Sequence, residues 1–166
     1  EAVDPDPASE TGPRAVTGWD GSYVGVGFGR VWASPDGRTW SSSALPEADP
    51  GYGWDIVAAP GFLVALGSSG ERAETWVSTD GTAWTRSGDP DLGPAGGYSY
   101  TSIEGMTAGP SGVVAVGTES GGGVQHPMAW WSADGLDWVR TGDALVGGGA
   151  RDVASGAPGY VMVGAD

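Results

Sequence analysis

The chain has 166 residues, enough for one domain with its own hydrophobic core, and its 32 Gly, 12 Pro, nine Trp and five Tyr favour a turn-rich β protein over a disordered chain. A formal net charge of −14 argues against nucleic acid and anionic lipid as partners, and the lack of cysteine excludes disulfides, thiolate metal sites and a cysteine nucleophile. With His126 as the single histidine, the usual zinc and two-histidine iron sites are nearly excluded, so we expect no metal and no cofactor.

The first segment, residues 1–13, is acidic, rich in proline and without periodicity. Such a segment is typical of a disordered tether that follows a removed export signal, which favours an extracellular or cell-surface protein. No apolar run approaches the roughly 20 residues that cross a bilayer, so we expect no membrane insertion.

After the tether, a pair of short apolar runs around a turn occurs four times. The pairs are 15–18 with 23–27, 56–59 with 63–67, 106–108 with 113–117, and 153–155 with 160–164. Every second run ends in a glycine, and these closing glycines are 40 to 50 residues apart: Gly27, Gly67, Gly117 and Gly164. A period of this length is typical of propeller blades.

A tryptophan motif follows three of these pairs and aligns without gaps. Its pattern is Trp-x-Ser-x-Asp-Gly-x-x-Trp, and the Asp-Gly dipeptide predicts a hairpin turn because glycine adopts a positive φ without strain. We expect the Ser and Asp oxygens to accept hydrogen bonds from backbone N–H groups of their own turn. The last Trp is expected to pack against strands or the next blade; the alternative is an exposed aromatic row for sugar stacking. The motif residues to which we assign structural roles are Ser34, Asp36, Gly37, Trp40, Ser78, Asp80, Gly81, Trp84, Ser132, Asp134, Gly135 and Trp138.

Each unit therefore predicts four antiparallel strands, and the fold class is an all-β propeller with about three and a half blades. The units are 14–53, 54–101 and 102–149, with a half unit at 150–166. The second run of each pair is almost wholly apolar, which fits a sheet that neighbouring blades cover on both faces. Because an open arc exposes a blade face and a strand edge, we expect further blades of the same chain, or other copies of it, as partners.

At the tryptophan motif the sequence resembles the Asp-box repeats, also called bacterial neuraminidase repeats, of sialidase-like β-propellers. The family pattern is Ser-x-Asp-x-Gly-x-Thr-Trp, and the segment 34–40 matches it with a turn one residue shorter. The resemblance covers about residues 14–166 and implies outer hairpins that lie away from the catalytic centre. Sialidases of this architecture use three arginines, a Tyr–Glu pair and an acidic proton donor, and no residue of this chain can be matched to them, so we assign no catalytic residue.

Two groups of residues are candidates for ligand binding. Alignment on the closing glycines places Asp55 and Asp152 in one slot of the first strand, and Glu104 joins them if the longer turn 109–112 absorbs one residue. Three carboxylates in this slot would line the channel mouth and attract a cation or a basic ligand, whereas the alternative is strand capping. The long loops 41–53 and 87–101 end near Trp54, Tyr98 and Tyr100, which could stack on a glycan or instead plug the channel.

The sequence thus predicts a secreted or cell-surface propeller that binds or scaffolds a glycan or a protein without catalysis. Two alternatives stay open, a fragment of a sialidase-like glycoside hydrolase and a structural repeat protein that assembles with itself. The motifs indicate a fold and do not by themselves identify a function.

Overall fold

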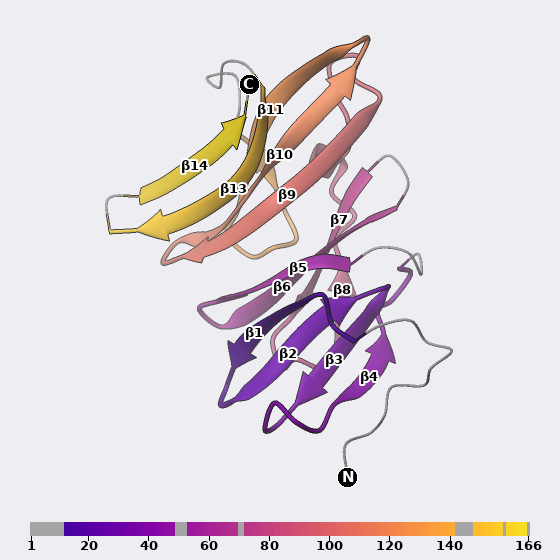
Figure 1. The fold of residues 1–166 in the computed structure, drawn as a ribbon, viewed down its shortest axis with the longest axis vertical. Helices are drawn as coiled ribbons and strands as arrows, with labels where there is room; N and C mark the ends of the chain where they lie inside the picture. Colours follow the sequence, from indigo (N-terminus) through magenta and orange to yellow (C-terminus); the bar gives the residue numbers. More distant parts are fainter. Residues whose placement is uncertain (1–11, 49–52, 70–71, 142–147, 158, 166) are drawn as a thin grey trace.

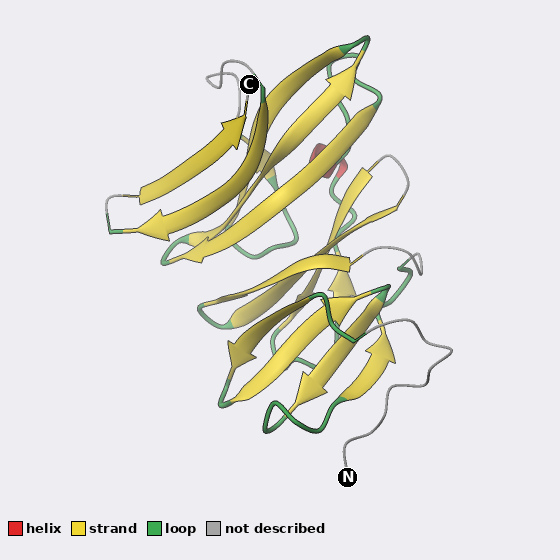
Figure 2. Cartoon of the chain, in the orientation of Figure 1, coloured by secondary structure: helices red, strands yellow, loops and turns green. Residues whose placement is uncertain are grey.

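The computed structural model describes residues 12–48, 53–69, 72–141, 148–157 and 159–165. All but the last two residues of the predicted tether 1–13 lie outside these ranges. The described part is built from β-strands, and its one helical segment is the short 3₁₀ turn η1, Pro90–Leu92 (Figures 1 and 2).

The strands form three four-stranded antiparallel sheets and one two-stranded sheet, in which the strands follow chain order. We call these sheets blades 1 to 4. Blade 1 contains β1 (Ala15–Trp19), β2 (Ser22–Gly27), β3 (Arg30–Ser34) and β4 (Ser41–Ala44). Blade 2 contains β5 (Gly53–Ala59), β6 (Phe62–Ser69), β7 (Arg72–Ser78) and β8 (Thr85–Arg86). Blade 3 contains β9 (Tyr100–Gly109), β10 (Gly112–Gly121), β11 (Val124–Ser132) and β12 (Val139–Arg140), and blade 4 contains β13 (Gly149–Gly156) and β14 (Gly159–Ala165).

The first strands of successive blades lie beside one another, since β1 contacts β5, β5 contacts β9 and β9 contacts β13 (Figure 1). From this inner row each sheet runs outward, strand by strand, to its last and shortest strand. This arrangement is that of a partial β-propeller, and it confirms the predicted fold class: three complete blades, one partial sheet and no long helix.

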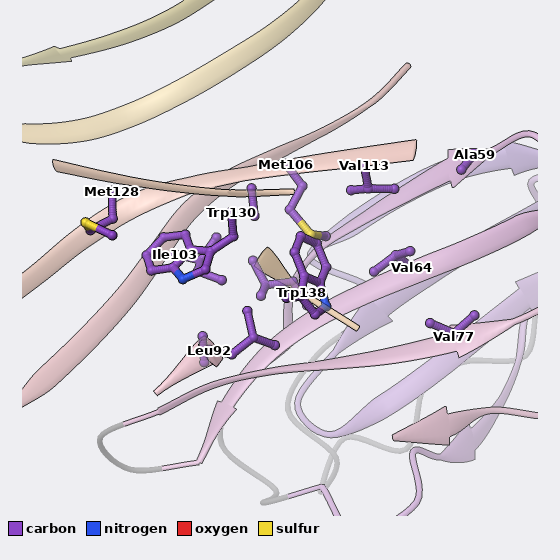
Figure 3. Close-up of a cluster of buried hydrophobic side chains, with 13 residues drawn as sticks. Ala59, Val64, Val77, Leu92, Ile103, Met106, Val113, Met128, Trp130 and Trp138 are labelled. Atoms are coloured by element: carbon purple, nitrogen blue, oxygen red, sulfur yellow. The ribbon is translucent and has the colours of Figure 1, made fainter. Parts of the chain in front are cut away.

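The apolar second strand of blade 2 is buried on both faces. Along β6, Leu63 and Ala65 pack with blade 1 in one hydrophobic cluster, whereas Val64 and Leu66 pack with blade 3 in another (Figure 3). Because side chains alternate across a sheet, a strand between two blades needs an apolar residue at every position. The continuous apolar run of β6 is therefore explained by the position of this strand between blades 1 and 3.

The need for glycine at the closing positions has a steric cause. In blades 2, 3 and 4 the register of the first strand shifts by one residue opposite the closing glycine, which is a β-bulge. The bulged strand passes so close that a Cβ at Gly117 would lie 1.9 Å from the carbonyl oxygen of Ser102, and one at Gly164 would lie 2.4 Å from that of Gly149. These positions require glycine because no side-chain atom fits there.

Candidate functional site

The Asp-Gly turns of the tryptophan motif are closed by their own Ser and Asp side chains. In blade 2 the Ser78 hydroxyl oxygen accepts the N–H of Gly81 at 2.8 Å, and Asp80 Oδ1 accepts the N–H groups of Thr82 at 2.7 Å and Ala83 at 2.8 Å. The same three bonds recur in the turns that contain Ser34 with Asp36 and Ser132 with Asp134.

These bonds to the charged form lower the carboxyl pKa values. The N–H groups of Ala83 and Thr82 lower the pKa of Asp80 to about 2. The pKa values of Asp36 and Asp134 are lowered in the same direction, chiefly by the N–H groups of Thr39 and Asp137 respectively. Each carboxylate is thus held ionised by its own turn.

In blades 2 and 3, the turn glycines and the final tryptophans face the preceding blade. Gly81 has φ +76° and Gly135 has φ +78°, and a Cβ on Gly135 would lie 2.6 Å from Val64 Cγ2 of blade 2. Trp84 and Trp138 are buried in the two inter-blade clusters, so they are not available as an exposed row for sugar stacking.

The strand register separates the three predicted channel carboxylates. Asp55 pairs with Leu66 and Asp152 with Val163, each one residue before a closing glycine, as the alignment predicted. In blade 3, however, the residue in this slot is Gly105, which pairs with Val116, and Glu104 is the bulged residue before it. The placement of Glu104 with the two aspartates was therefore wrong by one residue, because the turn after β9 has the same length as the turn after β5 and absorbs no residue.

Asp55 ties the first strand of blade 2 to that of blade 3. Its Oδ1 accepts the N–H of Ile56 at 2.8 Å, and its Oδ2 accepts the N–H of Met106 in blade 3 at 3.3 Å. Burial raises the pKa of Asp55 above its ordinary value, the two N–H groups lower it, and the negative charge of Asp152 raises it further. Asp152 itself accepts the N–H of Val153 at 2.8 Å. Both aspartates thus bond to the backbone at strand entry.

The bulge places another set of residues at one position of the first strands. Glu104 is the bulged residue of blade 3, Trp54 that of blade 2 and Arg151 that of blade 4. In blade 1 the N–H of Arg14 bonds to the carbonyl of Val26, which puts Arg14 at the matching position. Arg14, Glu104 and Arg151 are exposed, and they are available to a ligand in a way that Asp55 is not.

Sequence reasoning missed the two arginines. The signal for them was present, since each lies 13 residues before its closing glycine, Gly27 or Gly164, as Trp54 lies before Gly67 and Glu104 before Gly117.

A small cleft between blades 2 and 3 brings two of the predicted ligand-binding residues together. Tyr100 and Glu104 both line it, together with Ser68 and Ser102, and its volume is about 80 Å³. Tyr98 lies apart from this group and contacts the ring of His126, with 5.2 Å between the ring centroids. The cleft therefore combines an exposed aromatic ring, a carboxylate and hydroxyl groups.

Two arginines that could have bound an acidic ligand are occupied elsewhere. Arg86 on β8 pairs with Glu74 and, at 3.0 Å, with Glu47, while Arg140 on β12 pairs with the buried Glu119 at 2.6 Å. Arg86 and Arg140 hold equivalent positions opposite Trp76 and Trp130. Both arginines therefore form ion pairs on the last, outer strand of their blades.

Within the described ranges, no group of three or more His, Asp or Glu side chains is arranged to hold a metal ion. No helix in the described part of the chain is long and apolar enough to cross a membrane.

No known family model matches the chain, and no curated protein matches it. Two solved structures are similar in fold. One comes from work entitled "The GH130 family of mannoside phosphorylases contains glycoside hydrolases that target beta-1,2 mannosidic linkages in Candida mannan", with 15% identity, and the other is a glycosyl hydrolase from Bacteroides ovatus, with 16% identity. Both have a TM-score of 0.49, and each alignment covers 89% of this chain and 58% of the other. The chain thus spans little more than half the length of these proteins.

Proposed function

We propose that this chain is a propeller module of the Asp-box type that binds a neutral carbohydrate without catalysis. The observation that carries the proposal is the meeting of Tyr100 and Glu104 in one cleft at the inner rim of blades 2 and 3. An exposed aromatic ring offers an apolar face for the C–H side of a sugar, and a carboxylate accepts hydrogen bonds from sugar hydroxyls.

The size of the cleft limits the mode of binding. A volume of about 80 Å³ is well below the roughly 300–1,000 Å³ of a pocket that encloses a small molecule. The ligand would therefore lie across the rim, with one edge in the cleft and one face on Tyr100. A chain of sugars fits such a surface better than a single free monosaccharide, because neighbouring units gain contacts along the rim.

Charge selects among sugars. A net charge of −14 repels sialic and uronic acids at long range, and Glu104 adds a negative charge at the cleft itself. Neutral oligosaccharides are thus the preferred ligand class.

Calorimetric titration with a panel of neutral oligosaccharides, with sialyllactose as the acidic comparison, tests the proposal. Tyr100→Ala should weaken binding of a neutral ligand at least about tenfold, which is about 1.4 kcal/mol. Tyr160→Ala is the matched control, because Tyr160 is 37% exposed against 41% for Tyr100 and lies on β14 outside the cleft. Equal losses in the two variants, or preferred binding of sialyllactose, would contradict the proposal.

One observation favours a second candidate, a fragment of a glycoside hydrolase. Asp55 has a raised pKa and lies within the electrostatic range of Asp152, and a carboxylic acid with a raised pKa beside a second carboxylate is the pairing that glycosidases use. Against it, both oxygens of Asp55 accept backbone N–H groups. Turnover of a neutral aryl glycoside that is lost in Asp55→Asn would favour this candidate over the binding module.

A further inference from the structure

The sequence contains four Asp-Gly dipeptides, and one of them lies outside the tryptophan motif. Asp20 and Gly21 form the turn between β1 and β2, beside the paired residues Trp19 and Ser22. The other three dipeptides are the motif turns at 36–37, 80–81 and 134–135. An Asp-Gly pair is prone to attack of the glycine nitrogen on the aspartate side chain, because glycine has no side chain to hinder the approach. The four turns can therefore be compared as sites of one reaction.

The motif turns hold both reacting groups in hydrogen bonds. The reaction needs the glycine nitrogen as nucleophile and the aspartate Cγ as electrophile. In each motif turn the serine hydroxyl oxygen accepts the glycine N–H, at 2.8 Å in blades 1 and 2 and at 2.7 Å in blade 3. Two further backbone N–H groups bond to the carboxylate and lower the carboxyl pKa, so the group stays ionised and resists attack. The motif turns are thus protected on both sides of the reaction.

The turn at Asp20 has neither form of protection. Neither the Asp20 carboxylate nor the Gly21 N–H has a hydrogen-bond partner among the described residues. The Ser22 hydroxyl donates to the carbonyl of Trp19 and so involves neither reacting group. Exposure does not separate the four turns, because the dipeptide 36–37 is also exposed. The difference lies in the hydrogen bonds.

The backbone of Asp20 differs from that of the motif aspartates in a second way. Asp20 has φ +46°, a left-handed conformation that is unfavourable for a residue with a Cβ atom, whereas none of the three motif aspartates has a positive φ. An isoaspartyl link adds one CH₂ group and one rotatable bond to the main chain. Formation of this link therefore relieves strain at Asp20 and relieves none in the motif turns.

We propose that Asp20 is a modification site, at which the protein converts spontaneously to isoaspartate through the nitrogen of Gly21. The nitrogen bonds to Cγ of the protonated carboxyl and loses its proton, the Cγ–OH bond breaks, and one water leaves, which gives a five-membered succinimide. Water then opens the ring. Cleavage between the nitrogen and Cγ restores aspartate, and cleavage between the nitrogen and the former α-carbonyl carbon gives isoaspartate. One water leaves and one enters, so the mass is unchanged and nothing is oxidised.

The modification would change a surface away from the carbohydrate cleft. Asp20 lines an open hollow together with Thr79 and Asp80 of blade 2, and isoaspartate would move its carboxylate within this hollow. Asp20 follows the end of β1 that is far from the closing glycine, whereas the cleft is lined by the closing glycine Gly67. The inference is therefore independent of the carbohydrate proposal.

Tryptic mapping of the aged chain tests the inference, because cleavage after arginine places each turn in its own peptide: 15–30, 31–38, 73–86 and 87–140. The chain is kept folded at mildly acidic pH and 37 °C and then digested. Chromatography with electron-transfer fragmentation locates isoaspartate. Peptide 15–30 should contain at least about tenfold more isoaspartate than each other peptide, because the motif turns must open locally before they react. In a parallel sample unfolded in urea, the four peptides should react at similar rates.

Two variants check the cause. Asp20→Glu should abolish the signal in peptide 15–30, since glutamate would have to close a six-membered ring. Ser78→Ala removes the acceptor of the Gly81 N–H and should raise isoaspartate in peptide 73–86 of the folded chain. Far-UV circular dichroism checks that each variant keeps its β-sheet.

Three results would overturn the inference. The first is a folded chain whose peptide 15–30 gains no more isoaspartate than the motif peptides. The second is a signal in peptide 15–30 that persists in Asp20→Glu. The third is the same preference for peptide 15–30 in urea, which would show that the sequence around Asp20, and not the folded turn, selects the site.

Discussion

The indole N–H of Trp76 in blade 2 donates a hydrogen bond of 2.8 Å to the carbonyl of Pro46, which follows the last strand of blade 1. Trp130 makes the matching bond of 2.9 Å to Asp91 across the next interface. The bond therefore recurs at both interfaces. It holds the segment that follows the last strand of one blade against the third strand of the next blade.

The repeated bond predicts different results for equivalent tryptophans. Trp76→Phe should lower the free energy of unfolding by about 1–3 kcal/mol, because it leaves the carbonyl of Pro46 without its donor and shortens a buried side chain. Trp32→Phe should cost less, since the N–H that it removes has no partner among the described residues. Urea denaturation of both variants measures the difference, and equal losses would show that the hydrogen bond contributes nothing.

The carboxylate of the Asp-Gly turn should matter as a hydrogen-bond acceptor. Asp80→Ala removes the acceptor of the Thr82 and Ala83 N–H groups and should lower the melting temperature, while Asp80→Asn keeps one side-chain oxygen and should lower it less. Binding of an oligosaccharide at the cleft should be unchanged in both variants. Loss of binding at an unchanged melting temperature would instead assign the motif a direct role in function.

Acid should reduce the effect of Asp80 on stability within a defined pH window. The folded-state pKa of Asp80 is about 2, below its ordinary value of 3.8, so its contribution is present above pH 3.8 and is lost as the pH falls toward 2. The melting temperatures of the unaltered chain and Asp80→Ala should therefore converge over that range. The ionisation of Asp55 has the opposite effect on stability, because the pKa of Asp55 is raised in the folded state and its ionisation therefore opposes folding. NMR titration should place the midpoint of Asp80 well below that of Asp55.

The closing glycine should tolerate no side chain. Gly117→Ala would place a Cβ 1.9 Å from the carbonyl oxygen of Ser102, and we expect a loss of more than about 3 kcal/mol or failure to fold. Gly18→Ala on β1 is the control, since nothing lies within 4 Å of the added Cβ and the change should stay within about 1 kcal/mol. Soluble yield and thermal melting compare the two, and a stable Gly117→Ala protein would contradict the steric account.

The chain should not hydrolyse a sialoside. Arg86 and Arg140 are held in ion pairs with glutamates, and the overall negative charge disfavours an acidic substrate. A fluorogenic sialoside incubated with the purified chain is the assay. Turnover that a single Tyr or Glu substitution abolishes would refute this expectation.

The sequence predicted the blades because their constraints are local and repeat. The apolar second strands follow from burial on two faces, and the Asp-Gly turns follow from the positive φ of Gly37, Gly81 and Gly135. The candidate site was predicted less well. Glu104 was placed with Asp55 because the glycine-rich turn 109–112 was expected to hold an extra residue, whereas its register matches that of the turn after β5. The cleft that joins Tyr100 to Ser68 depends on the packing of two blades, which no pattern within one repeat contains.

The inner-strand bulge separates the part of the repeat that must stay constant from the part that can vary. Its steric demand falls on the closing glycine, whereas the residue type in the matching slot of the first strand varies among the blades: Arg14, Trp54, Glu104 and Arg151. A substitution at Arg14, Glu104 or Arg151, whose side chains are exposed, changes the chemistry of the rim without entering the packing of the blades. The same scaffold could thus be given a different ligand by changing these side chains, in the way that antibody loops vary on a fixed framework.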